Sequence, residues 1–572
     1  MTPGRRAVLA RIDLGARVLL AVLLIVVTAV YRFNTLGGTF GGFDNDHFVP
    51  FAYAKQVEAG AQPLRDFAGL GLQGAWPSLT YEASALAQRR LGDSLRSEAL
   101  LSIGGVAAAV AVTFVTASLV ANAGWALLAT LLSVIVAPTL YNYPKVLMFA
   151  LGCLAIVLYA RRPGVPAAAG GGVLTAVAFL FRHDYAVYIG LGLLAVCATA
   201  RHTDARRHAA VFAGLTALLL LPSLVYLQYY AGLVDYLRDG LELSRREADR
   251  TNLAIWPPFN FQPVPGRGLT LRRFFEFEPN GVAWLYYLAR LLPVASLVVL
   301  VPSRGDGDRQ GEQRGVRAAM LAIAFMFACS TPFLIRGNVA PRLGDVGPMI
   351  AVLAAGVAHA ASRRAPAGWR AWQVPALVAL FATILGTALA ARTVGALETQ
   401  LRVAGLSQSW PETRRRANDV WEQLGALPAG VLAGEGGPES LRLARYLRRC
   451  TGPDDRVAVL AYRPEILPFA GRLFAAGRLS IIPGYVLGPR QQQALVAQWQ
   501  REQVPIALVE YEEFTDPAST AAPLVRDYLR EHYRRAATVG GGERPLVVYV
   551  RRDRAVVATD AATALPCLRW HP

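Results

Sequence analysis

The acidic pair Asp44 and Asp46, in the segment 42–48, is the first group of residues in this sequence that could carry chemistry. Carboxylates two positions apart project to the same side of an extended backbone, but not of a helix. One of them could accept a proton from an attacking hydroxyl group, or both could bind a divalent cation through their oxygens. Solvated turns and helix caps use the same residue types, so the pair alone leaves both interpretations open.

A second candidate group is the run Arg182, His183 and Asp184, which separates two apolar stretches. The planar guanidinium of Arg182 could form a forked, charge-assisted contact with a phosphate group. His183 could donate a hydrogen bond or carry a proton. The alternative is an ordinary Arg–Asp pair at a membrane interface.

Three further cations have similar positions next to apolar stretches: Lys145, Arg336 and Arg342. Arg336 could hold a phosphate group in the same way as Arg182. Lys145 is one of only two lysines in the chain, and it could contact a phosphate or simply anchor a helix at the membrane interface.

Long apolar stretches must position these residues. The chain is 54% hydrophobic and only 17% charged, and a soluble chain carries about a quarter charged residues. Runs close to the ~20 residues that cross a bilayer recur between Leu14 and Ala391, which excludes one large soluble helical domain. We therefore expect a mainly α fold, a polytopic bundle of about eleven spans. The expected spans are 14–33, 99–121, 124–141, 146–160, 165–181, 185–200, 209–230, 284–302, 317–335, 344–361 and 371–391.

The distribution of arginine predicts how the spans are oriented. If the N-terminus is cytoplasmic, four arginine-rich links fall on the inside, as the positive-inside rule requires. The candidate residues and everything after Ala391 then lie outside, in the manner of a bacterial inner-membrane protein. The first span lacks a small-residue cleavage site, so we expect a retained anchor. The four links are 161–162, 201–207, 304–317 and 363–370.

The segment after the last span is expected to be soluble. We divide the chain into a membrane domain (1–391, with outer loops 34–98 and 231–283), a linker with a helical stretch (392–440) and an α/β domain (441–572). Cys450 and Cys567 of the last domain could form a disulfide in an oxidising compartment, although their geometry is not evident from sequence. Strands are expected at 457–461, 506–511 and 546–550, and helices at 464–470, 491–503 and 523–533.

The net charge of +18 does not indicate a nucleic-acid partner. The positive charge is nearly all arginine, and much of it lies in the short links between apolar runs. That placement is typical of membrane orientation and not of a basic face that binds phosphodiesters.

The first outer loop resembles that of GT-C-type membrane glycosyltransferases, in particular the bacterial branch of protein O-mannosyltransferase-like and lipid A sugar-transferring enzymes. The resemblance consists of Gly-Phe-Asp44, then 54–57, then Gly60 and the phrase Pro-Leu-Arg-Asp-Phe at 63–67. Leu64 stands where the family usually has tyrosine. A late segment from Arg336 is similar to the family's R-x-D…H, but Asn338 replaces the usual Asp and no His follows within the next 20 residues.

This resemblance implies transfer of a sugar from a polyprenyl-phosphate donor to the hydroxyl group of a glycan, lipid or protein acceptor, with inversion. Asp44 would be the base and Asp46 a second acidic position, and both would be the ligands of Mg or Mn if a metal is used. A lipid transporter or flippase, or a membrane scaffold without catalysis, is the alternative. The residues expected to bind substrate or phosphate are Arg182, His183, Asp184, Arg336, Arg342, Lys145, Arg65 and Asp66.

Overall fold

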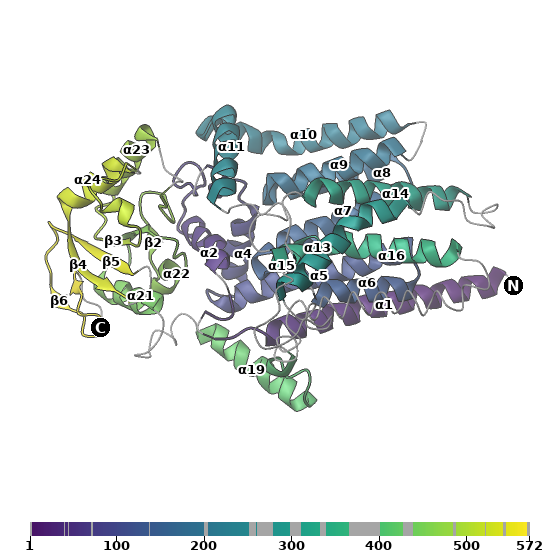
Figure 1. Ribbon diagram of the computed structural model, residues 1–572, viewed down its shortest axis with the longest axis horizontal. Coiled ribbons are helices and arrows are strands. Elements are labelled where there is room, and N and C mark those ends of the chain that lie inside the picture. Colours follow the sequence, from purple (N-terminus) through teal and green to yellow (C-terminus); the bar gives the residue numbers. More distant parts are fainter. Residues whose placement is uncertain are drawn as a thin grey trace. The chain divides into compact units, whose positions relative to one another are not determined.

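The computed structural model divides the chain into two compact units (Figure 1). The first unit contains residues 1–35, 102–222 and 251–417, and the second contains 36–101, 223–250 and 418–572. Each unit combines segments that are distant in sequence. The domain bounds expected from the sequence stay a prediction. The structure describes residues 3–38, 40–43, 45–69, 72–135, 138–199, 204–250, 259, 278–297, 310–331, 339–364, 401–426, 439–483, 488–520, 522–540 and 545–568.

The first unit is a bundle of apolar helices. Small residues allow these helices to approach closely: a Cβ on Gly192 of α9 would lie 2.8 Å from Ile156 and 3.2 Å from Met326. Close contact at small residues is how helices associate in a bilayer, where burial of apolar surface provides little driving force. The described helices, of which α5 and α10 lie partly in the second unit, are α1 (Pro3–Asn34), α5 (Leu95–Val120), α6 (Ala123–Ile135), α7 (Tyr143–Arg161), α8 (Val165–Phe181), α9 (His183–Thr199), α10 (Ala205–Tyr230), α13 (Glu278–Ala295), α14 (Gln310–Ser330), α15 (Val339–Asp345) and α16 (Gly347–Arg364).

Four of the described helices are long and apolar enough to cross a membrane: Leu14–Asn34, Leu95–Val120, Leu140–Arg161 and Ala205–Tyr230. Two shorter apolar helices, Val165–Phe181 and His183–Thr199, coincide with expected spans. The expectation of a mainly helical membrane bundle is confirmed in this coarse form. The total of about eleven spans stays a prediction, and the expected span at 371–391 lies outside the described residues.

The second unit contains a mixed five-stranded sheet with the order β2-β1-β3-β5-β4. Strand β1 pairs in parallel with β2 and β3, and β5 runs antiparallel to β3 and β4. The short strands β6 and β7 form a separate antiparallel pair. The strands are β1 (Arg456–Leu460), β2 (Leu473–Phe474), β3 (Ile506–Val509), β4 (Tyr533–Val539), β5 (Leu546–Arg551), β6 (Ala558–Thr559) and β7 (Pro566–Cys567).

Helices of the second unit come from three parts of the chain. The tail provides α21 (Glu439–Cys450), α22 (Ile466–Ala470), α23 (Pro489–Arg501) and α24 (Pro523–His532), and α19 (Trp410–Ala426) extends from one unit into the other. The expected outer loop 34–98 is largely helical, with α2 (Asn45–Glu58), α3 (Leu72–Ala75) and α4 (Leu79–Leu91). Helix α11 (Leu233–Arg250) follows α10.

Aromatic side chains join the first outer segment to the tail within this unit. Phe48 of α2 lies against Phe469 of α22, with ring centroids 5.4 Å apart. Tyr53 contacts Phe67 and Phe474 at 5.5 and 5.7 Å. Aromatic pairs of this kind contribute about 0.5–1.5 kcal/mol each beyond the area they bury. The polar loop expected from the sequence is therefore part of the core of the second unit.

The strands and helices expected in the tail are present, with ends shifted by a few residues. Strand β4 was not expected. It is one of the two edge strands of the sheet, and Arg534 and Arg535 near its start are exposed. Charged side chains are common on edge strands, where they block further pairing, and they conceal the alternation that identifies a strand.

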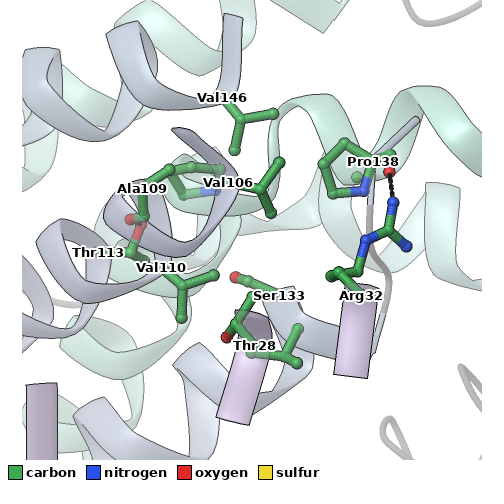
Figure 2. A pocket seen from close by; sticks show the side chains of 12 residues that line it. Thr28, Arg32, Val106, Ala109, Val110, Thr113, Ser133, Pro138 and Val146 are labelled. Carbon is green, nitrogen blue, oxygen red and sulfur yellow. Dashed lines mark hydrogen bonds between the residues drawn. The ribbon is translucent and has the colours of Figure 1, made fainter. Parts of the chain in front are cut away.

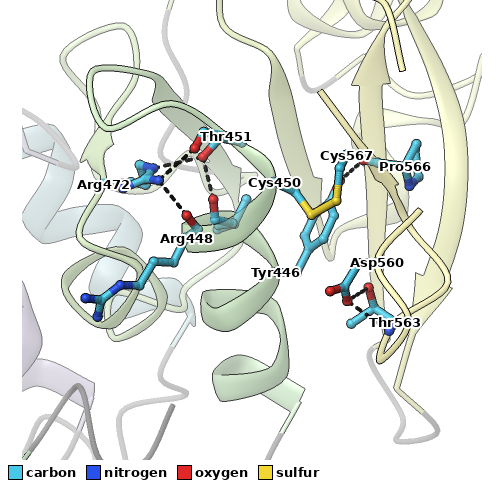
Figure 3. The surroundings of a disulfide bond; sticks show 10 residues. Tyr446, Arg448, Cys450, Thr451, Arg472, Asp560, Thr563, Pro566 and Cys567 are labelled. Atoms are coloured by element: carbon cyan, nitrogen blue, oxygen red, sulfur yellow. Dashed lines mark hydrogen bonds between the residues drawn. A yellow bond between two sulfur atoms is a disulfide. The ribbon is translucent and has the colours of Figure 1, made fainter. Parts of the chain in front are cut away.

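Cys450 and Cys567 form a disulfide that joins the end of α21 to β7, with Cα atoms 4.3 Å apart (Figure 3). Beside it, the Tyr446 hydroxyl donates to the Pro566 carbonyl at 2.7 Å. Arg472 donates to the carbonyls of Arg448 and Thr451 at 2.9 and 2.8 Å. A cation that binds the last carbonyls of a helix is a favourable cap.

We predict that the double substitution Cys450→Ala and Cys567→Ala lowers the melting temperature of the purified protein. The bridge spans 117 positions, and closing a loop of this order restricts the unfolded chain by about 5 kcal/mol in the entropic model. Cys329→Ala, which removes a free thiol, is the matched control. Equal melting temperatures for the double variant and the control would contradict the prediction.

Candidate functional site

The buried carboxylate of Asp345 is the centre of a polar cluster in the first unit. Asp345 ends α15 and is 1% exposed. Its Oδ2 accepts hydrogen bonds from Lys145 Nζ at 3.1 Å and from Asn142 Nδ2 at 3.2 Å. A buried charge is costly unless it is paired and hydrogen-bonded, so these contacts fix the start of α7 to the end of α15.

Two arginines lie close enough to act on this carboxylate. The charges of Arg182 and Arg342 both interact with Asp345. Arg182 Nε is also 3.0 Å from Asp184 Oδ1, and its guanidinium lies over the ring of Tyr185 at 5.7 Å. The Arg182 side chain is 52% exposed, so it can reach a ligand without leaving a closed core.

We name this group the cation cluster: Lys145, Arg182 and Arg342 with Asp345 and Asp184. Three cations and two carboxylates leave one net positive charge. The three cations come from links that are far apart in the sequence, and the sequence identified each of them separately. His183, between Arg182 and Asp184, is partly buried at the start of α9. Arg336 and Asn338 lie outside the described residues, so the role expected for Arg336 stays a prediction.

The first unit also contains a small apolar pocket (Figure 2). Val146 and Gly344 line it, and they directly adjoin Lys145 and Asp345 in the chain. Arg32 also borders the pocket, and its guanidinium donates to the Pro138 carbonyl at 2.7 Å. The lining residues are Thr28, Arg32, Val106, Ala109, Val110, Thr113, Ser133, Val134, Pro138, Val146, Gly344 and Pro348.

Asp46, the described member of the acidic pair expected to carry catalysis, belongs to the second unit. Asp44 lies outside the described residues. Asp46 is exposed in the first turn of α2. Its backbone is therefore helical, and not extended as was considered for the pair. The Tyr462 hydroxyl, just after β1, donates a hydrogen bond to Asp46 Oδ1. The tail therefore supplies a side chain that orients this carboxylate.

Next to Asp46, a buried pair that the sequence did not reveal fixes the start of α2. His47 Nε2 lies 3.6 Å from Glu98 Oε2, and both side chains are less than 5% exposed. Glu98 also accepts hydrogen bonds from Gln88 Nε2 at 2.8 Å and from the Ser84 hydroxyl. The only feature of the sequence that could have indicated this buried pair was a histidine next to the acidic pair.

Arg65 and Asp66 form a salt bridge in a turn of the second unit. Arg65 Nη2 is 2.6 Å from Asp66 Oδ2, which also accepts from the backbone N–H of Gln62 at 2.7 Å. The hydrogen bond from Arg65 holds the pKa of Asp66 below its usual value. Leu64 has a positive φ of 62°, and its N–H donates to the Phe67 carbonyl at 2.8 Å. Substrate binding by this turn stays a prediction.

Other charged groups of the tail lie after the parallel strands of the sheet. Arg463, after β1, pairs with Glu510, after β3, at 3.1 Å. Glu465 is 2% exposed and accepts from the Ser440 hydroxyl at 2.7 Å, and burial raises its pKa. Among the described residues no three His, Cys, Asp or Glu side chains are placed to hold a metal ion. Metal binding by the acidic pair stays a prediction, since Asp44 is outside them.

No family model and no curated protein matches this chain in sequence. Among solved structures, it is similar to ArnT from Cupriavidus metallidurans bound to undecaprenyl phosphate, with 12% identity and a TM-score of 0.49, over 94% of this chain and 98% of that one. It is also similar to the apo oligosaccharyltransferase of Archaeoglobus fulgidus, with 12% identity and a TM-score of 0.44, over 93% of this chain and 74% of that one.

Both similar structures are GT-C glycosyltransferases, the class that the first outer loop resembles.

We predict that Asp345→Ala destabilises the protein more than Asp345→Asn. Alanine leaves Lys145 without its buried counter-charge, and breaking a buried pair costs about 3 kcal/mol or more. Asparagine keeps an oxygen that can accept from Asn142 and Lys145. The measurement is the melting temperature of each purified variant in detergent. Equal losses, or no loss for Asp345→Ala, would show that the pair does not stabilise the fold.

Proposed function

We propose that this protein is a membrane glycosyltransferase that moves a sugar from a polyprenyl-phosphate donor to the hydroxyl group of an acceptor outside the cytoplasm. The observation that supports this proposal is the cation cluster. Three cations from three distant links gather around one buried carboxylate.

The cation cluster would bind the phosphate of the donor. The isoprenoid chain would follow the apolar surface, and the phosphate would contact Arg182 and Lys145. Arg182 is accessible and has the planar fork that phosphate binding favours. Because Asp345 holds Lys145 in place without a ligand, little side-chain ordering would remain to be done on binding.

The acidic pair would act on the acceptor. Asp44 would take the proton of the acceptor hydroxyl, whose oxygen forms a bond to the anomeric carbon as the bond from that carbon to the phosphate oxygen breaks. Attack opposite the leaving phosphate inverts the anomeric carbon. The polyprenyl phosphate leaves as an anion, so positive charge to stabilise it is needed and an acid is not.

A lipid transporter or flippase is the second candidate, because the cation cluster could bind a lipid phosphate without any chemistry. A scaffold without catalysis is the third. An acidic pair whose described member is oriented by Tyr462 favours the enzyme, since neither alternative needs an oriented carboxylate. Release of sugar from a polyprenyl-phosphate donor by the purified protein separates the enzyme from both alternatives.

We predict that Asp44→Asn lowers turnover by about 10²–10⁴-fold, the usual contribution of a positioned base. Asp46→Asn should also lower turnover, by a smaller factor. The matched control is Glu58→Gln at the other end of α2, where the carboxylate pairs with Lys55. The assay follows transfer of labelled sugar to a hydroxyl acceptor with each variant in the same membrane preparation. Near-normal transfer by Asp44→Asn would refute the base.

The same assay tests the contact between Tyr462 and Asp46. Tyr462→Phe should lower kcat, and combining it with Asp46→Asn should lower kcat no further, because the phenol acts through that carboxylate. Tyr549→Phe, on β5, makes the same chemical change elsewhere in the sheet. Additive losses in the double variant would mean that Tyr462 has a separate, structural role.

A further inference from the structure

Helix α11 of the second unit has an exposed apolar face that the proposed reaction does not use. Val234, Leu237 and Leu241 are 67%, 55% and 67% exposed, and Leu233 is 37% exposed. Spacings of three and four place these side chains on one side of the helix. An exposed stripe of large aliphatic residues on a charged helix indicates contact with something apolar.

A different face of α11 is fixed within its own unit. Tyr236 is 3% exposed, and its hydroxyl donates to the Trp76 carbonyl at 3.0 Å. The two rings meet edge to face with centroids 5.5 Å apart. The exposed stripe is therefore not the face by which α11 packs in the fold.

The remaining face of α11 is charged. Asp235 and Arg238 form an exposed pair at 3.5 Å, and Glu242 and Arg245 are exposed further along. The helix thus has a buried side, an apolar exposed side and a charged side. Apolar and charged stripes next to each other are the pattern of helices that lie in a lipid–water interface.

The segment before α11 places it next to a membrane. Helix α10 (Ala205–Tyr230) is long and apolar enough to cross a bilayer. It ends with Tyr229 and Tyr230, which are 80% and 37% exposed, and tyrosines are enriched where spans leave the membrane. Only Ala231 and Gly232 separate the two helices, and Gly232 has a φ of 76°, which glycine adopts without strain.

We propose that α11 lies in the lipid–water interface, with Val234, Leu237 and Leu241 among the acyl chains and Arg238 and Arg245 at the level of the lipid phosphates. Long arginine side chains can reach the headgroups from such a position. Through the contact between Tyr236 and Trp76, α11 anchors the first outer segment of the second unit to the membrane surface. This role does not depend on the proposed reaction.

The test places nitroxide labels on the full-length protein in vesicles of phosphatidylethanolamine and phosphatidylglycerol. Cys153, Cys197 and Cys329 are replaced by alanine, and single cysteines are introduced as Leu237→Cys, Leu241→Cys and, on the charged face, Glu242→Cys. Collision with dissolved oxygen reports lipid, and collision with a water-soluble nickel chelate reports water. The melting temperature shows whether each labelled variant is folded.

Labels at Leu237 and Leu241 should have an oxygen-to-nickel collision ratio severalfold higher than the label at Glu242. Equal, low ratios at all three positions would overturn the proposal, because the helix would then lie in water. Labels at Leu237 and Leu241 that neither reagent reaches would also overturn it and would indicate a protein partner. Spin–spin coupling that grows with protein density would identify that partner as a second copy.

Discussion

The buried ion pair of Lys145 and Asp345 is the interaction on which the candidate donor site depends. A carboxylate at 1% exposure is tolerated only because Lys145 and Asn142 bond to it and because Arg182 and Arg342 lie near. The cations in turn need the carboxylate, because they would repel one another without it. Asp345 therefore gathers basic residues from three links, and the accessible Arg182 remains able to contact an anion.

The sequence predicted the parts of this site that depend on local pattern. Apolar runs located the helices, and Lys145, Arg182 and Arg342 were identified as cations at span ends. The orientation that the arginine-rich links indicate stays a prediction. The sequence did not predict Asp345 as the centre, because Lys145 and Asp345 are 200 positions apart and only packing reveals that they meet. The His47–Glu98 pair was missed for the same reason: a buried Glu near the start of an apolar helix looks like a solvated one in sequence.

In the tail, too, features with a local sequence pattern were predicted and features that depend on packing were not. Strands β1 and β3 were predicted because they are continuous apolar runs with turns after them, whereas the edge strand β4 carries exposed arginines that hide its alternation. The pairing of Cys450 with Cys567 required the distance between their Cα atoms. Packing of the first outer segment against the tail could not be read from sequence either, because the aromatic contacts join residues such as Phe48 and Phe469 across most of the chain.

Binding of a polyprenyl phosphate to the purified protein, compared with the same polyprenol without phosphate, tests the central claim most directly. The cation cluster predicts that the phosphate increases affinity by about tenfold or more, as expected for hydrogen bonds to a charged group. Arg182→Gln should remove most of this preference, and Arg161→Gln at the far end of α7 should retain it. Equal binding of the two lipids by the unmodified protein, or an Arg182→Gln variant that keeps the full preference, would contradict the account.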